Sequence, residues 1–161
     1  EVSVAYAPGS AGEGLMGFSG DGRRTTTRLL DGEFPKYRQL LPEESSTVTT
    51  VNRASLIEAV KRVSLVAERN TPVRLTFSGD DVALQAGSGD EAQATEALEG
   101  ATTGDTIEIA FNPQYLLDGL GAIESSDVRF SFTGATRPAV LTPADSGDSY
   151  KYLLMPVRLS S

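Results

Sequence analysis

One stretch of the sequence reads Val51-Asn-Arg-Ala-Ser-Leu-Ile-Glu-Ala-Val60, and it recurs sixty positions later as Phe111-Asn-Pro-Gln-Tyr-Leu-Leu-Asp-Gly-Leu120. In each copy an asparagine follows an apolar residue and precedes apolar residues at helical spacing. Asparagine caps helices well because its side chain accepts a hydrogen bond from a free backbone N–H group. The pattern predicts two capped helices, from about Ala54 to Arg69 and from Asn112-Pro113 to about Ile123, with Pro113 at the first helical position.

Alternating apolar residues around these helices predict strands. Before and after the first helix they fall at residues 47–51, 73–77, 82–86 and 92–98, and around the second at 106–111, 128–133, 137–142 and 150–157. The sequence therefore predicts an α+β domain of two βαβββ halves, which extends from about Thr47 to Leu159.

The first 42 residues match the end of this domain at an offset of 114 positions. Phe18-Ser19-Gly20 falls on Phe132-Thr133-Gly134, and Leu40-Leu41-Pro42 falls on Leu154-Met155-Pro156. We therefore expect residues 1–42 to be the last strands of a preceding copy and a crossover, and residues 43–161 to be the complete domain. The first residue is not methionine, which suggests a fragment. Each match rests on fewer than ten positions, so chance similarity is the alternative.

Composition excludes several classes of protein. The 161 residues are 39% hydrophobic and 22% charged, as expected of one or two globular domains. The absence of cysteine and histidine excludes disulfides and thiolate metal sites, and it removes the commonest general base. No apolar run is long enough to span a bilayer and no signal peptide is evident, so we expect a cytoplasmic protein.

Charge is distributed unevenly along the chain. The formal net charge is −8, yet no Lys or Arg lies between Leu75 and Val128, where eleven acidic residues fall. The remainder carries 14 basic and 11 acidic residues. This surplus could be concentrated on one surface that meets an anionic partner, and the alternative is a solvated acidic protein surface.

Three separated strings resemble one protein family. They are Leu29-Leu-Asp-Gly-Glu-Phe-Pro-Lys-Tyr-Arg-Gln-Leu-Leu-Pro42, Ile109-Ala-Phe-Asn-Pro-Gln-Tyr115 and Tyr152-Leu-Leu-Met-Pro-Val-Arg-Leu159. In this order they resemble the middle-to-last domain crossover, the second helix and the C-terminal tail of bacterial DNA sliding clamps, the beta subunits of DNA polymerase III. Arg137-Pro-Ala-Val140 is similar to actinobacterial members.

The resemblance implies a non-catalytic processivity factor without a cofactor, associated with the nucleoid. Family members are head-to-tail homodimers with three domains per subunit, and the ring encircles duplex DNA. It binds the polymerase III alpha subunit, the clamp loader, other polymerases and repair proteins through short linear motifs. Candidates for facing DNA are Arg53, Lys61, Arg62 and Arg69. The alternative is that these four residues are ordinary exposed charges of a helix, in which Glu58 pairs with Arg62 four positions later.

The resemblance also implies a pocket for those peptides. Matched position by position, its residues are Pro35, Gln39, Leu40, Asn112, Tyr115, Thr136, Pro138, Leu154, Met155, Pro156, Val157 and Arg158. Methionine suits such a pocket because its flexible thioether adapts to different partners. The family strand that lines the other half of the pocket would precede Glu1. The ring contact is expected at Leu65, Val66 and the edge strand 92–98.

Two rival functions were considered. Paired carboxylates at Asp80-Asp81 or Asp90-Glu91 could bind a metal in an enzyme, but adjacent strand residues point to opposite faces. The glycines between Gly9 and Gly22 fit neither a P-loop nor a dinucleotide fingerprint. The second rival is a standalone acidic adaptor that binds peptides without encircling DNA.

Overall fold

The structure is a computed structural model, and it describes residues 1–9, 14–30, 32–34, 36–42, 44–66, 71–87, 92–146 and 150–158. The chain forms two compact units, Glu1–Tyr37 and Arg38–Ser161. Each is considered by itself.

The first unit is a three-stranded antiparallel sheet in the order β1 (Ser3–Ala7), β2 (Leu15–Gly20) and β3 (Arg23–Arg28). Strands β2 and β3 are joined by a tight turn, in which Asp21 and Gly22 both have positive φ, as a two-residue type I′ turn requires. The offset of 114 positions does not hold throughout this unit. It places β1 on residues 117–121, which are helical.

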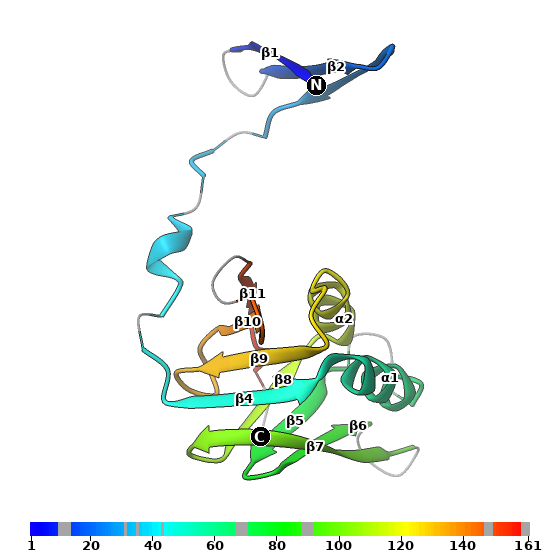
Figure 1. The fold of residues 1–161 in the computed structure, drawn as a ribbon, viewed down its shortest axis with the longest axis vertical. Helices are drawn as coiled ribbons and strands as arrows, with labels where there is room; N and C mark the ends of the chain where they lie inside the picture. The colour runs from blue at the N-terminus through cyan, green and yellow to red at the C-terminus, as the bar shows by residue number, and fades with distance from the viewer. Residues whose placement is uncertain are drawn as a thin grey trace. The chain divides into compact units, whose positions relative to one another are not determined.

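The second unit contains the two predicted βαβββ halves (Figure 1). A short 3₁₀ helix, Tyr37–Gln39, precedes them. The first half consists of β4 (Thr47–Asn52), α1 (Arg53–Ser64), β5 (Val73–Ser78), β6 (Asp81–Ala86) and β7 (Ala94–Gly104). The second consists of β8 (Ile107–Phe111), α2 (Pro113–Gly121), β9 (Asp127–Phe132), β10 (Ala139–Pro143) and β11 (Tyr152–Leu154). The predicted fold class is therefore confirmed.

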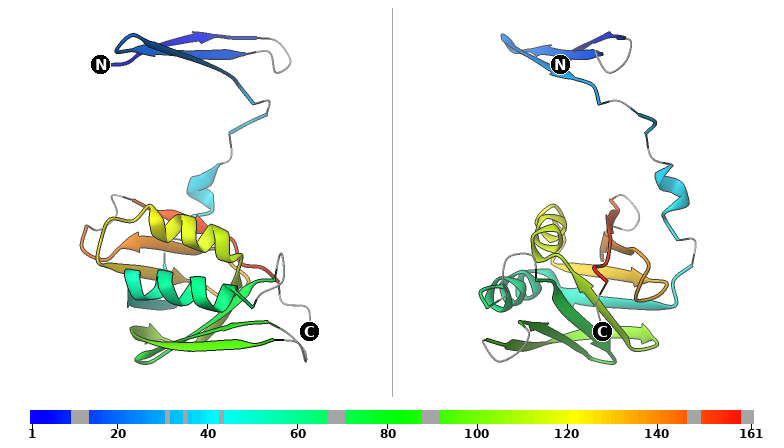
Figure 2. Two further views of the ribbon diagram at one scale, coloured as in Figure 1. Left: turned by 90° about the vertical axis from the view of Figure 1, so that its right-hand side faces the viewer. Right: turned by 180° about the vertical axis from the view of Figure 1, so that it is seen from behind.

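One eight-stranded sheet joins the halves in the order β11-β10-β9-β4-β7-β6-β5-β8. The first strand of each half pairs with the other half, β4 with β9 and β8 with β5. Both helices lie side by side on one face of the curved sheet (Figure 2). Strand β4 also pairs with β7 of its own half, whereas β8 pairs with β5 of the first half and lies apart from β9, β10 and β11. The second half therefore cannot form a continuous sheet from its own strands.

The core lies between the helices and this face. Leu56 and Val60 of α1 and Leu116 and Leu120 of α2 are fully buried there. A cluster of three phenylalanines spans both halves: the Phe77 ring centroid is 4.8 Å from that of Phe132 and 5.3 Å from that of Phe130. Aromatic contacts at such distances add to the free energy gained from apolar burial.

Both predicted caps are present, but several predicted ends are wrong. The Asn52 side chain accepts from the Ser55 N–H at 3.0 Å. Helix α1 was expected to reach Arg69, yet it ends at Ser64, because the N–H of Leu65 turns to the carbonyl of Arg62 and tightens the last turn. Residues 67–70 lie outside the described part. Strand β7 extends beyond residue 98, whereas β11 is shorter than predicted. None of the helices in the described residues is long and apolar enough to cross a membrane.

Candidate functional site

The tail after β11 borders a cavity of about 390 Å³. Its lining residues come from β8, the β9–β10 turn and the tail, and they are Glu108, Ile109, Ala110, Ala135, Thr136, Met155, Pro156, Val157 and Arg158. The structure thus brings together five of the predicted pocket residues, Thr136 and the four tail residues. Met155 is 61% exposed. An exposed thioether beside an apolar hollow can receive an apolar side chain of a partner.

A backbone hydrogen bond holds the tail in this position. The N–H of Val157 donates to the carbonyl of Ala110 at 2.8 Å, so the tail runs beside β8 although it is no longer a strand. Leu154 behaves differently from its neighbours. It is 2% exposed and belongs to the core cluster. Leu154 is a predicted pocket residue that is not among those lining the cavity, and its burial holds the start of the tail against the core.

The first turn of α2 supplies two further predicted residues. Asn112 is the N-cap, and its Oδ1 accepts from the N–H groups of Gln114 at 2.9 Å and Tyr115 at 3.4 Å. This amide oxygen is therefore engaged in the cap. Tyr115 is 60% exposed, and its ring is free to meet a ligand. Its backbone carbonyl accepts a hydrogen bond from the Tyr152 hydroxyl at 2.9 Å.

The other predicted pocket residues are not among those that line the cavity. Gln39 ends the 3₁₀ helix and Leu40 follows it, and both are exposed. Pro138 lies just before β10, two residues beyond Thr136. Pro35 lies outside the described residues.

Three residues beside the tail were missed by sequence reasoning. Glu108 lines the cavity and lies 3.5 Å from the guanidinium of Arg74, so the cavity has a charged rim. Tyr152 joins the tail to α2, and burial, followed by the charge of Asp118, raises its pKa. Gly119 lies against the Tyr152 ring. An isolated glycine inside a helical pattern was the available signal, since it often marks a close approach.

Strand β7 presents an open edge. Residues 94–99 pair with β6, and residues 100–104 pair with β4. In the described part of the chain, residues 94–99 have a strand partner on one side. Leu65 at the end of α1 is 85% exposed, and Val66 is partly buried against the core. An unpaired strand edge next to an exposed leucine is suited to pairing with another chain.

The predicted cations of α1 are engaged with protein groups. The Nε of Arg53 donates to the carbonyl of Ser125 at 2.8 Å. Lys61 pairs with Glu58 at 2.9 Å, so Glu58 does not take the Arg62 partner that sequence spacing suggested. Arg69 lies outside the described residues.

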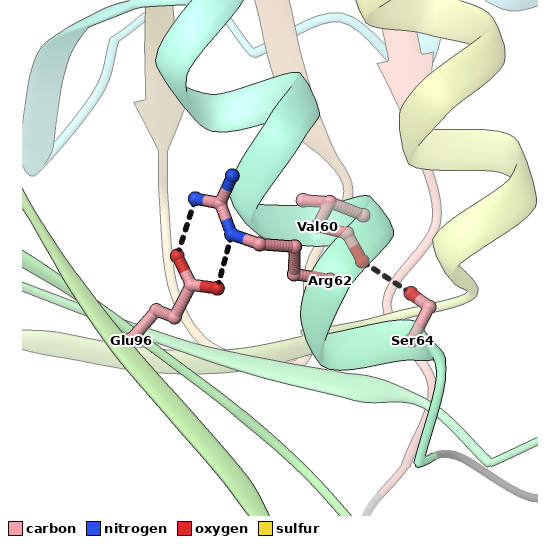
Figure 3. Close-up of polar contacts among 4 residues, drawn as sticks. All are labelled: Val60, Arg62, Ser64 and Glu96. Carbon is pink, nitrogen blue, oxygen red and sulfur yellow. Dashed lines mark hydrogen bonds and ion pairs between the residues drawn. The ribbon is translucent and has the colours of Figure 1, made fainter.

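Arg62 forms a two-pronged ion pair with Glu96 of β7 (Figure 3). Both hydrogen bonds measure 2.7 Å. The hydrogen bond from Arg62 lowers the pKa of Glu96, and the reciprocal bond raises the pKa of Arg62. Ser64 donates to the Val60 carbonyl one turn back, next to this pair. The pair fastens the end of α1 to the edge strand.

The acidic residues are dispersed over the surface of the described part of the chain rather than gathered at one point. Among the described residues there is no group of three or more carboxylates that could hold a metal ion. Asp90 and Glu91 lie outside that part of the chain, while Asp80 and Asp81 are at the β5–β6 turn.

Comparison with known proteins gives a consistent result. The sequence model of the DNA polymerase III beta subunit, C-terminal domain, matches residues 38–158. The beta sliding clamp of Streptomyces coelicolor is 54% identical over 165 aligned positions, which cover 99% of this chain and 44% of that protein.

Two solved structures show the same likeness in three dimensions. The DNA polymerase beta subunit of Streptococcus pyogenes superposes with a TM-score of 0.84 at 31% identity, over 98% of this chain and 42% of that one. The sliding clamp of Bartonella birtlesii, solved bound to griselimycin, gives 0.81 at 32% identity, over 90% and 39%. The chain spans less than half the length of these relatives. On the family match and these similarities, the chain belongs to the DNA polymerase III beta subunits, the bacterial sliding clamps.

Proposed function

We propose that this chain acts as the peptide-binding part of a sliding clamp, a non-catalytic processivity factor of the replicative polymerase in the cytoplasm. The observation that carries the proposal is the tail pocket, in which Met155 is held out beside an apolar cavity by the Val157 to Ala110 hydrogen bond. Its partners are short linear motifs of the polymerase alpha subunit, the clamp loader and repair proteins. The relative that was solved bound to griselimycin supports a ligand-binding role for the fold.

The pocket chemistry favours an apolar side chain flanked by polar groups. Val157, Pro156 and Met155 offer aliphatic and thioether surface, while Arg158 and Glu108 supply charge at the rim. Buried apolar contact provides affinity and the polar rim provides orientation. A peptide of the form Gln-x-x-Leu-Phe satisfies both requirements.

The test is a titration of a fluorescent Gln-x-x-Leu-Phe peptide against the chain, a variant without residues 157–161, and Met155→Ser. Loss of such a wall costs about 1–3 kcal/mol of binding, roughly a 5- to 150-fold loss of affinity. Leu65→Ser is the matched control, because Leu65 is also an exposed apolar residue of the same unit but does not line the cavity. Equal affinity for Met155→Ser and Leu65→Ser would refute the pocket assignment, and melting temperatures identify any variant that fails to fold.

We further propose that the open edge of β7 and Leu65 form one side of a head-to-tail ring contact. Such a contact is heterologous, so this surface pairs with a different surface of the next subunit. Mixing the chain with the first domain of the Streptomyces coelicolor clamp should give a complex in sedimentation velocity. Leu65→Ser should weaken that complex and Met155→Ser should not. A ring-sized assembly of this chain alone would contradict the proposal.

For DNA, we propose a loose contact through α1. The pair of Lys61 with Glu58 is exposed and therefore weak, so Lys61 can exchange its partner for a phosphate. Arg53 and Arg62 are more firmly held by Ser125 and Glu96. Weak, screened attraction suits a ring that must slide along duplex DNA rather than stop on it.

A further inference from the structure

Tyr152 joins β11, which leads into the tail, to α2, which carries the predicted pocket residue Tyr115. It lies on β11, paired with Leu141 of β10, and its hydroxyl reaches across to α2. There it donates to the carbonyl of Tyr115 at 2.9 Å. A helical carbonyl has a second lone pair, so this bond adds to the helix without replacing a bond within it. The hydroxyl is thus a direct link between β11 and the turn that presents the Tyr115 ring.

Gly119 lets the Tyr152 ring come this close. A Cβ built on Gly119 would lie 2.5 Å from two carbons of that ring, which is closer than atoms can pack. Glycine inside a helix is unfavourable relative to alanine, so its place here needs a local reason. The matching position of α1 is Ala59, which is fully buried and carries its methyl group without difficulty. The approach of the Tyr152 ring supplies the reason in α2.

The tail is held on both sides of the exposed methionine. Tyr152 fixes it to α2 before Met155, and the N–H of Val157 fixes it to Ala110 after Met155. Leu154 is buried in the core between these two points. Met155 therefore has little freedom to move relative to Tyr115, although both side chains are mostly exposed.

We propose that Tyr152 is a positioning residue of the peptide pocket, which sets Tyr115 on α2 and Met155 on the tail at a fixed separation without lining the cavity itself. The inference rests on the proposed peptide-binding function. A tyrosine hydroxyl is protonated at neutral pH and can donate this hydrogen bond, and burial of the ring raises the pKa of Tyr152 further. A wall that is fixed in advance loses less conformational freedom when a peptide binds, which favours affinity.

The test uses the whole chain and the Gln-x-x-Leu-Phe peptide, with dissociation rate and affinity measured well below the melting temperature. Tyr152→Phe keeps the ring and removes the hydroxyl, and it should weaken binding by roughly 3- to 10-fold. Gly119→Ala should also weaken binding, because its methyl group displaces the ring. In the Tyr152→Ala background the same Gly119→Ala change should have no further effect, since the ring it displaces is absent.

A core variant separates positioning from general stability. Val82→Ala in β6 should lower the melting temperature while it leaves the peptide dissociation rate unchanged. If Tyr152→Phe and Gly119→Ala bind peptide like the unmodified chain, or if Val82→Ala weakens binding as they do, Tyr152 has no positioning role. If neither the unmodified chain nor a longer clamp chain that includes the strand expected before Glu1 binds the peptide, the proposed function itself is wrong. Should Tyr152→Ala not fold, Tyr152→Phe and Gly119→Ala still decide the question.

Discussion

The two halves of the second unit share one plan but fasten their helices differently. In the first half, Arg62 of α1 forms an ion pair with Glu96 of β7. In the second, the ring of Tyr152 packs on Gly119 and its hydroxyl bonds to α2. The α2 position that matches Arg62 is Ala122, and the α1 position that matches Gly119 is Ala59. The helices and strands that the halves share form the fold, whereas the contacts that hold each helix to its last strand differ. The Arg62–Glu96 ion pair lies beside the proposed ring contact, and the Tyr152 contacts lie beside the proposed peptide pocket.

The last strands of the halves differ in the same way. Strand β7 is 11 residues long. Its first part pairs with β6, and its second part pairs with β4. Strand β11 is 3 residues long, after which the chain leaves the sheet and keeps the Val157 bond to Ala110. A long strand with an unpaired segment offers backbone groups to another chain. A short strand followed by an apolar tail offers side chains, which suits peptide recognition.

The largest expected effect on stability comes from the phenylalanine cluster, to which both halves contribute. Phe77→Ala removes a fully buried ring that contacts Phe130 and Phe132 of the other half. It should lower the free energy of unfolding by roughly 3–5 kcal/mol, measured by urea denaturation. Both halves should unfold together, because their strands are interleaved. Separate transitions for the two halves would break this picture, and Phe18→Ala, at a partly exposed ring in β2, is the control.

Removing the helix cap of either half should lower the free energy of unfolding by a moderate amount, which should differ between the halves. Asn52→Ala and Asn112→Ala each remove a helix cap, at about 0.5–2 kcal/mol of stability. The cost should be greater for Asn52, because its amide also donates to Ser126 and Asp127. Asn112→Ala should weaken peptide binding as well, since it loosens the turn that carries Tyr115. Thermal melts and peptide titration of both variants test this, and equal peptide affinity would remove the first turn of α2 from the pocket.

The smallest expected effect is the pH dependence of the stability that the Arg62–Glu96 ion pair contributes. Arg62 lowers the pKa of Glu96 in the folded protein, so the carboxylate favours the folded state above its unfolded pKa of about 4.3. That contribution is lost as the pH falls through the lower, folded pKa. The stability difference between the unmodified chain and Glu96→Gln should therefore be largest near neutral pH and shrink on acidification, in urea titrations at several pH values. Glu99→Gln on the same strand is the control, and a difference that grows at low pH would contradict the assignment.

The parts that could be predicted from the sequence depend on neighbours along the chain. The caps Asn52 and Asn112 and the strand alternation are local, and these predictions are confirmed. The end of α1 was predicted wrongly, because apolar spacing continued past Ser64 while the backbone bonds changed. The burial of Leu154 in the core could not be predicted, since a strand end and a core residue have the same composition.

The sequence by itself determined the repeated βαβββ plan, the two helix caps and the apolar tail, because each follows from periodicity or from one residue and its near neighbours. Tertiary structure alone decided that Arg62 meets Glu96, that Tyr152 meets Gly119, and that Val157 meets Ala110. These partners are separated by more than thirty residues of chain. The order of the strands in the sheet brings them together, and no local pattern encodes that order.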